Sequence, residues 1–342
     1  MKGNWAPIVF VLAATAAAQE SRREGTDPKL LDELRTCRHK IVCESHRDNN
    51  FELILMNADG SDPVNLTKTP DIDELYPKAS PDGTKIAFLA EEGKGEARRR
   101  DLYVMNVDGT GRKKIGENAR DPAWSPDGKK IAYLKGEFDK HTVVVFATKR
   151  LFIHDLATGE TREHANKDLE HLFSLDWSTD GRWFVTTVHG GMGFSHSILA
   201  IEAEGTRFFD LKLRGCRPDL APGGRRVVWG WGDYAIGIAD LDLNAAEPVA
   251  TNHRKAVVSK EPIMTYHMDW SPDARYVVFT RGPKSPKKML EGATRETPGV
   301  QAPGWDLCVC DPNGDNRWIQ LTSDGLSYKE PDWVFVGNGA GK

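Results

Sequence analysis

The chain has 342 residues, with 46 Lys and Arg against 50 Asp and Glu, so its formal net charge is −4. Proteins that bind nucleic acid normally show a basic excess, and this balance argues against that class. Five cysteines, an odd number, leave at least one thiol unpaired if disulfides form. Cys308 and Cys310 are expected to point to one face of a strand as packing residues, while a pairing of Cys37 with Cys43 stays open.

Residues 1–18 are predicted to be a secretory signal peptide. Lys2 supplies the positive start, residues 8–14 are apolar but short, and Ala16-Ala17-Ala18 offers a cleavage site between Ala18 and Gln19. A short buried helix or a membrane anchor is the alternative interpretation. No later segment of the sequence is apolar enough to cross a membrane. We therefore expect a periplasmic or secreted protein without a transmembrane segment.

Residues 19–38 are predicted to form an N-terminal arm, in which Leu30, Leu31 and Leu34 have helical spacing. After this arm a short phrase recurs along the chain. An apolar segment ends at Trp or a small residue, a Ser-Pro-Asp-Gly turn follows, and an alternating strand comes next. The clear copies are residues 76–88, 121–133 and 267–279, and the weaker copies are residues 175–185 and 218–229.

The two ends of this repeat pattern are both incomplete. The last copy, residues 330–333, has no second strand after it, whereas the strands expected at 40–43, 52–56 and 64–67 have no first strand before them. Six units, roughly 43 to 63 residues apart, predict an all-β fold, a six-bladed β-propeller of four-stranded antiparallel blades over residues 39–336. We expect the N- and C-terminal strands to pair in one shared blade, and residues 337–342 to form a flexible tail.

Two parts of the sequence resemble the propeller repeat of TolB and its relatives. They are residues 80–88 with 101–110, and the similar copy in residues 52–60 with 65–67. The resemblance implies a TolB-like, WD-like repeat propeller over roughly residues 39–335. TolB is periplasmic and binds envelope partners, including a peptidoglycan-associated lipoprotein, so the resemblance implies an envelope protein or peptide as partner. TolB also has an α/β domain before its propeller, and the few residues before residue 39 imply a propeller without that domain.

The first strand of each propeller blade lines a central channel, and the position three residues before each anchor residue is expected near the channel mouth. These candidate binding residues are Tyr76, Asp121, Ser174, Arg217, His267 and Glu330. One interpretation is a polar network that bonds to itself and fills the ring with water. The other is a pocket for a polar peptide end or a sugar acid, where Arg217 pairs with a carboxylate and Asp121 or Glu330 accepts hydrogen bonds.

Long inserts at residues 91–100, 136–149, 189–197 and 282–304 are predicted on the same face. Four histidines expected near that face are candidates for a divalent metal site, namely His171, His189, His196 and His267. Their spacing matches no defined metal motif, so we expect no cofactor. The sequence thus favours a non-enzymatic protein- or peptide-binding scaffold of the periplasm or cell envelope. The alternative is a metal-assisted polysaccharide lyase or hydrolase that acts on an acidic glycan.

Overall fold

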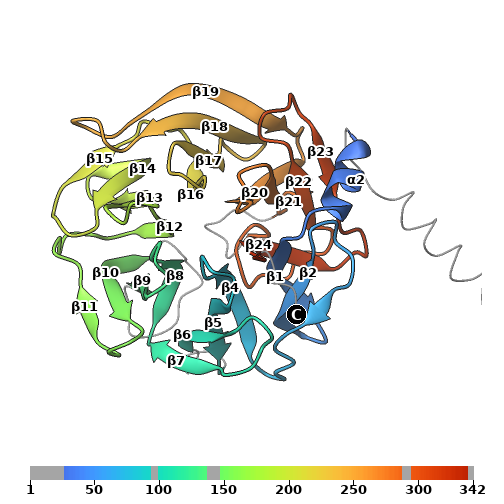
Figure 1. The fold of residues 1–342 in the computed structure, drawn as a ribbon, viewed down its shortest axis with the longest axis horizontal. Coiled ribbons are helices and arrows are strands. Elements are labelled where there is room, and N and C mark those ends of the chain that lie inside the picture. The colour runs from blue at the N-terminus through green and yellow to red at the C-terminus, as the bar shows by residue number, and fades with distance from the viewer. Residues whose placement is uncertain (1–26, 94–98, 137–146, 287–293, 338–342) are drawn as a thin grey trace, which may run out of the picture.

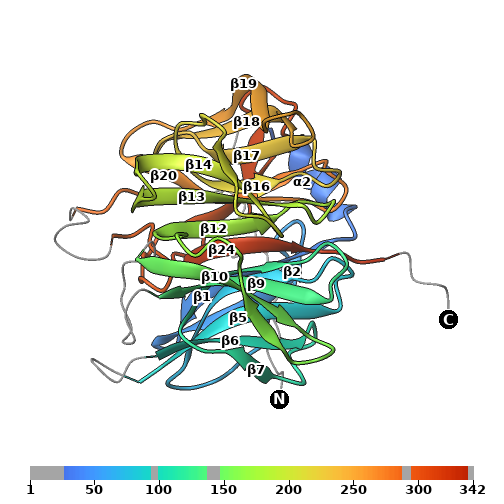
Figure 2. The ribbon, with the colours of Figure 1, turned by 90° about the vertical axis from the view of Figure 1, so that its left-hand side faces the viewer.

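The structure is a computed structural model that describes residues 27–93, 99–136, 147–286 and 294–337. The predicted signal peptide with its cleavage site at Ala18-Gln19, the first part of the arm, and the tail beyond residue 337 lie outside these residues. Six four-stranded antiparallel sheets stand as blades around a common axis (Figure 1). Their strands run from one face of the ring to the other (Figure 2). The predicted six-bladed β-propeller is confirmed.

Five blades are each made from four consecutive strands, which run from the innermost to the outermost position. Blade 1 contains β4 (Asp73–Ala79), β5 (Lys85–Glu92), β6 (Arg99–Asn106) and β7 (Lys113–Gly116). Blade 2 contains β8 (Ala119–Trp124), β9 (Lys130–Gly136), β10 (Thr148–Asp155) and β11 (Thr161–Glu163). Blade 3 contains β12 (Leu172–Trp177), β13 (Trp183–Gly191), β14 (Phe194–Glu202) and β15 (Phe208–Asp210). Blade 4 contains β16 (Cys216–Leu220), β17 (Arg226–Gly230), β18 (Ala235–Asp242) and β19 (Val249–Val258). Blade 5 contains β20 (Ile263–Trp270), β21 (Val277–Pro283), β22 (Asp306–Cys310) and β23 (Trp318–Gln320).

Blade 6 is shared by the two ends of the chain. Its innermost strand is β24 (Ser327–Val334), followed by β1 (Lys40–Arg47), β2 (Asn50–Asn57) and β3 (Val64–Asn65). The antiparallel pairing of β24 with β1 places Lys40 opposite Val334 and His46 opposite Ser327. Every residue of β24 is buried. The predicted closure is therefore confirmed, and main-chain hydrogen bonds within one sheet join the two ends of the ring.

Each innermost strand carries a β-bulge at the same place, and one residue of the bulge has a left-handed backbone conformation. The pairing register of β4 with β5 shifts between Leu75 and Lys78, and a shift occurs at the matching point of every other blade. The residues with φ between 44° and 58° at this point are Tyr76, Asp121, Ser174, Arg217, His267 and Glu330. Such a φ is uncommon for a residue other than glycine. The bulge takes a backbone N–H out of the ladder, so that Ser174 N donates instead to Asp121 Oδ1 of the preceding blade at 2.8 Å.

The Ser-Pro-Asp-Gly turns connect the first and second strands, as the sequence predicts. In blade 1, Ser80 Oγ donates to Asp82 Oδ1 at 2.6 Å and accepts from Lys85 N at 2.9 Å. Gly83 has a φ of +69°, and a Cβ at this position would lie 1.8 Å from the carbonyl oxygen of Phe335. The glycine is therefore needed both for the turn and for the close approach of the chain that leaves β24.

A short helix, α2 (Lys29–Arg35), packs on the outside of blades 5 and 6 (Figure 1). Its three leucines are buried in one apolar cluster with residues of both blades, namely Leu30, Leu31 and Leu34. Arg317, just before β23, reaches the helix and forms an ion pair with Glu33 at 2.6 Å. The helical spacing in the sequence thus corresponds to a helix whose apolar side covers the edge of the propeller.

All five cysteines lie in described residues and are thiols, including Cys37 and Cys43, whose pairing the sequence left open. Cys308 and Cys310 are buried in the apolar cluster between blades 4 and 5, consistent with their interpretation as packing residues. Among the described residues, no helix has both the length and the apolar character that a membrane span requires.

Candidate functional site

A cavity of about 510 Å³ lies on the propeller axis, and all six candidate binding residues line it. Five of them are at least nine-tenths buried, and Ser174 is partly exposed. The sequence placed these side chains near an open mouth, whereas the structure places them deep in the channel wall. The bulge of each innermost strand accounts for their convergence, because it places the same position of all six blades at the same depth.

The deepest layer contains one buried ion pair and a neutral histidine. Arg217 Nη1 lies 2.8 Å from Glu330 Oε1, and His267 Nε2 lies 3.2 Å from the same oxygen. Burial lowers the pKa of Arg217, but Glu330, together with smaller effects of Tyr76 and Asp121, raises it, and the net shift is upward. Burial, together with the charges of Arg217 and Lys329, holds the pKa of His267 well below its usual value. His267 is therefore neutral, and its Nε2 carries the proton because Nε2 faces two acceptors, Glu330 and the Glu296 carbonyl.

Two buried polar atoms of this layer lack a hydrogen-bond partner among the described residues. They are Tyr76 Oη and Asp121 Oδ2, and both residues are at most 5% exposed. The other oxygen of Asp121 accepts the Ser174 N–H. Burial raises the pKa of Asp121 to about 6. An unsatisfied buried polar group costs about 1–3 kcal/mol, so these two atoms are suited to bond to an occupant of the cavity.

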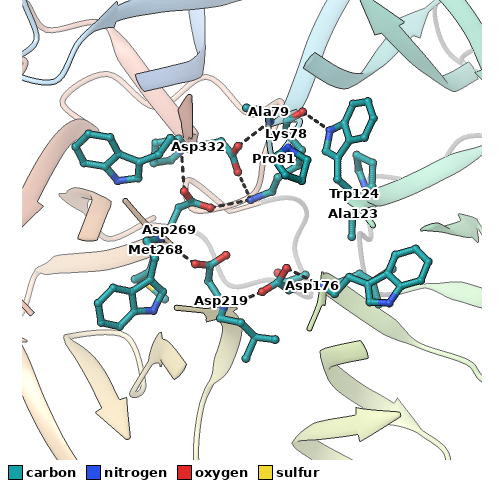
Figure 3. A pocket seen from close by; sticks show the side chains of 18 of the residues that line it. Lys78, Ala79, Pro81, Ala123, Trp124, Asp176, Asp219, Met268, Asp269 and Asp332 are labelled. Carbon is teal, nitrogen blue, oxygen red and sulfur yellow. Dashed lines mark hydrogen bonds and ion pairs between the residues drawn. The ribbon is translucent and has the colours of Figure 1, made fainter. Parts of the chain in front are cut away.

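A second layer of charged side chains lies two residues further along each innermost strand. Its positions are Lys78, Ala123, Asp176, Asp219, Asp269 and Asp332. Figure 3 shows Lys78 pointing between Asp269 and Asp332, at 3.4 Å and 2.8 Å from their carboxylates. Asp176 and Asp219 lie farther round the ring and form no ion pair within the described residues. Sequence analysis missed this layer.

The four aspartates of the second layer each connect two blades. Asp332 accepts the N–H of Ala79, and Asp269 accepts that of Trp333, at 2.7 and 2.9 Å. Asp176 and Asp219 accept the matching N–H groups of their next blades, at 2.7 and 2.9 Å. The signal that could have revealed them is an Asp directly before the anchor residue in four of the six repeats. Carboxylates at this level therefore have a structural role in addition to any binding role.

Burial dominates the ionisation of this layer. It raises the pKa of Asp176 to about 6, and it holds the pKa values of Asp219 and Asp332 well above the usual range. Neighbouring carboxylates add to the effect for Asp219 and Asp332. Burial lowers the pKa of Lys78, but the combined effect of Asp332, Asp269 and Asp219 raises it, and the net shift is upward. Lys78 is thus charged, and among the described residues it and Arg217 are the two cations that line the cavity.

The outer end of the cavity is aromatic and opens between the Ser-Pro-Asp-Gly turns. Lining residues at this end are Pro81, Trp124, Pro126, Trp177, Pro222, Trp270, Pro272, Trp333 and Phe335. Trp124 Nε1 donates to the Lys78 carbonyl at 2.8 Å. The indole N–H groups of Trp270 and Trp333 have no partner among the described residues. Four tryptophans therefore form a rim, which we call the aromatic rim, around the carboxylates below.

The opposite end of the channel is covered by residues 294–304, which we call the cover segment. Its backbone bonds to three side chains of blades 5 and 6. The Glu296 carbonyl lies 3.0 Å from His267 Nε2, Lys329 Nζ donates to Thr297 O at 2.6 Å, and Gly299 N donates to Glu44 Oε1 at 2.9 Å. The described part of this insert therefore lies against blades 5 and 6 at the end of the channel where the sequence predicted an open mouth.

The four histidine candidates lie in two places. His267 is in the channel, whereas His171, His189 and His196 lie around the hairpin of β13 and β14. His189 Nδ1 and His196 Nδ1 are 2.9 Å apart, and His196 Nε2 lies 2.8 Å from the Gly215 carbonyl. In the part of the chain that the structure describes, no group of three or more His, Cys, Asp or Glu is placed to hold a metal ion.

No family model matches the sequence. TolB of Methylococcus capsulatus, a Tol-Pal system protein, is 35% identical over 83 residues, which are 23% of this chain and 18% of that protein. Dipeptidyl-peptidase 5 of Porphyromonas gingivalis is 33% identical over 112 residues, which are 30% of this chain and 16% of that protein. A TolB homologue of Chlorobium luteolum is 26% identical over 163 residues, covering 36% and 35% of the two chains. The matches thus span about a third or less of these relatives.

Solved structures show the same fold over more of the chain. TolB from Acinetobacter baumannii superimposes with a TM-score of 0.61 at 18% identity, over 86% of this chain and 66% of that chain. A propeller from a nidogen/laminin complex gives a TM-score of 0.60 at 8% identity, over 87% and 98%. The fold and the axial cavity define a six-bladed β-propeller. Its repeats are similar to those of TolB, and the chain is a TolB-like propeller.

Proposed function

We propose that this propeller is an exported, non-enzymatic scaffold that binds a protein or peptide of the cell envelope in its central channel. The observation that carries the proposal is a cavity of about 510 Å³ whose wall contains buried polar atoms of Tyr76 and Asp121 without partners among the described residues. A ligand that bonds to these atoms satisfies their hydrogen-bonding capacity. The TolB-like repeats support an envelope partner, because the relatives that share them include Tol-Pal system proteins.

The closed ring also suits a binding role. All six innermost strands contribute to the cavity wall, and a sheet network that closes on itself holds their side chains in place without a ligand. A preorganised site loses little conformational entropy when a partner binds.

The direct test is a pull-down from the native cell envelope with residues 19–342 as bait. The Tyr76→Phe/Asp121→Asn double variant removes the hydroxyl and the charge while keeping the shape of both side chains. Asp315→Asn, on an exposed turn outside the cavity, is the matched control. We expect a protein that the parent and the control retain and the double variant loses. A partner that binds all three equally would place the interaction outside the channel.

Export and the enzymatic alternative are tested on the same protein. N-terminal sequencing of material recovered from the cell envelope is expected to begin at Gln19. A metal-assisted polysaccharide lyase or hydrolase would instead show stoichiometric metal and cleavage of an acidic polysaccharide. If the protein contained metal and cleaved the polysaccharide, and if a His171→Ala/His196→Ala variant lost both properties, the enzymatic role would replace the binding role.

A further inference from the structure

The two ends of the channel differ in a way that indicates where a ligand enters. The cover segment bonds to Glu44, His267 and Lys329 and lies over the deep end. At the other end, the cavity is lined by the turns that follow each innermost strand, including Pro81 and Pro272. A ligand that reaches the deep layer therefore passes the aromatic rim first, then the aspartates, and then Tyr76 and Asp121.

The cavity has a large excess of carboxylates. Six line it, against two cations, Lys78 and Arg217. Glu330 is paired with Arg217, and Asp269 and Asp332 are paired with Lys78. Asp176 and Asp219 accept only backbone N–H groups within the described residues. Both are partly exposed to the cavity, and a positively charged occupant would stabilise the ionised form of both carboxyl groups against the effect of burial.

The arrangement of the acids favours an organic cation over a bare metal ion. No group of three acidic or other ligating side chains among the described residues is close enough to chelate one ion. The carboxylates that form no ion pair among the described residues instead lie at two depths, with Asp176 and Asp219 above and Asp121 below. The volume of about 510 Å³ also exceeds by far the share of about 30 Å³ that one water occupies in the liquid. A long side chain with a terminal charge spans such a site.

The aromatic rim suits the stem of the same side chain. Lys and Arg carry a hydrocarbon stem that packs on apolar surface while the charged head remains in a polar environment. Indole faces attract a passing ammonium or guanidinium group. The rim already accommodates one cation in this way, because Arg226 lies 4.6 Å from the centre of the Trp270 ring.

We propose, on the basis of the binding role above, that the channel receives a lysine or arginine side chain of a partner, which enters between the Ser-Pro-Asp-Gly turns. The stem contacts Trp270 and Trp333, and the charged head bonds to the carboxylates of Asp176 and Asp219. A head that reaches the deep layer also meets Asp121 and the hydroxyl of Tyr76. The basic residue of the partner thus adds a second positive charge, besides that of Lys78, to the four aspartates of this layer.

The test uses four capped pentapeptides, all glycine except for a central Lys, Arg, Gln or Glu. Binding to the full protein is followed by equilibrium dialysis and by tryptophan fluorescence, to which the four rim tryptophans contribute. We expect the Lys or the Arg peptide to bind at least about tenfold more tightly than the Gln peptide, and the Glu peptide not to bind. Comparison of the Lys and Arg peptides identifies which head group the site prefers.

The matched variant is Asp176→Asn/Asp219→Asn, which removes two ionisable groups and leaves one amide oxygen at each position. This oxygen can accept the Trp270 N–H at position 219, and one of the two N–H groups, those of Trp177 and Leu220, that Asp176 accepts. The double variant should weaken the binding of the better basic peptide by about tenfold or more, while Asp315→Asn leaves it unchanged. Equal binding of the Lys and Gln peptides, or an unchanged affinity in the double variant, would overturn the proposal. So would calcium chloride that saturates the site while no peptide binds, because the occupant would then be an inorganic cation only.

This proposal and the binding role can fail separately. If the pull-down yields a partner that the Tyr76→Phe/Asp121→Asn variant loses, but no basic peptide binds, the scaffold role stands and the cationic side chain is wrong. If neither the pull-down nor the peptides give binding, both are wrong.

Discussion

Among the residues of the channel, Lys78 is the one whose substitution should lower the free energy of unfolding most. It lies between Asp269 and Asp332, and its side chain is 27% exposed. Lys78→Met keeps much of the stem but leaves two mostly buried carboxylates without their cation. Removal of one partner of a buried pair costs about 3–5 kcal/mol, and partial exposure places this site near the lower end, at about 3 kcal/mol.

The loss of stability in Lys78→Met should depend on pH. The pKa of Asp332 is already well above its usual value, mainly because of burial, and removal of Lys78 would raise it further. A group whose pKa is raised by folding stabilises the fold at low pH and loses that contribution as the pH rises. The variant should therefore be destabilised by about 3 kcal/mol at pH 8 and by clearly less at pH 5.

Urea unfolding of both proteins at pH 5 and pH 8 measures the difference, provided that the slope of the transition is unchanged. The Lys78→Met/Asp332→Asn double variant is the control, because removal of one uncompensated charge should restore much of the stability. A loss that is the same at both pH values, or no rescue in the double variant, would refute the assignment of Lys78 as the counter-charge of the ring.

Three further outcomes are expected. Asp176→Asn should stabilise the fold at pH 8 by about 1–2 kcal/mol and have little effect at pH 4, because burial raises the pKa of this carboxyl to about 6, although Lys78 and two backbone N–H bonds oppose the shift. The full shift is discounted because water reaches the group. Thermal unfolding at the two pH values measures this, and a destabilisation at pH 8 would contradict it. Leu34→Ala, in α2, should cost about 2–5 kcal/mol in urea unfolding, whereas Asp32→Ala on the exposed side should be near neutral; equal effects would show that the helix is not docked. Deletion of residues 330–342 should remove most of β24 and cause aggregation or non-cooperative unfolding, and a truncated protein that melts as sharply as the parent would exclude ring closure by this strand.

The blades could be predicted from sequence because the repeat carries local information. Ser80, Asp82 and Gly83 specify a turn through their own hydrogen bonds and backbone conformation, and the copies of this turn set the spacing of the blades. The six channel positions followed from the same spacing. These positions converge on one cavity because each has the same place in an equivalent blade.

The depth of the site and its covered end could not be predicted in the same way. The cover segment contacts Glu44 and Lys329, which are distant from it in sequence, through backbone groups that carry no sequence signal. The bulge at Tyr76 and at the equivalent positions could not be predicted either. Its positive φ is adopted by residues other than glycine, so no glycine marks it in the sequence. The aspartate layer was visible before the anchor residues, but its role depends on backbone N–H groups of the next blade, which only the closed ring brings into reach.

The aspartates of the second layer allow structural and binding roles to be separated. If Asp176 and Asp219 only connect blades, Asn at either position can keep the N–H bond from the next blade, removes a buried ionisable group and raises stability at neutral pH, without an effect on binding. At position 176 the second N–H bond, from Trp177, is lost. If they also receive a cationic side chain, the same substitution raises stability and weakens binding. If the site is retained at the expense of stability, the substitution should raise the free energy of unfolding and lower the affinity for the ligand. A variant that gains stability and keeps its affinity would assign the carboxylates to the architecture of the ring alone.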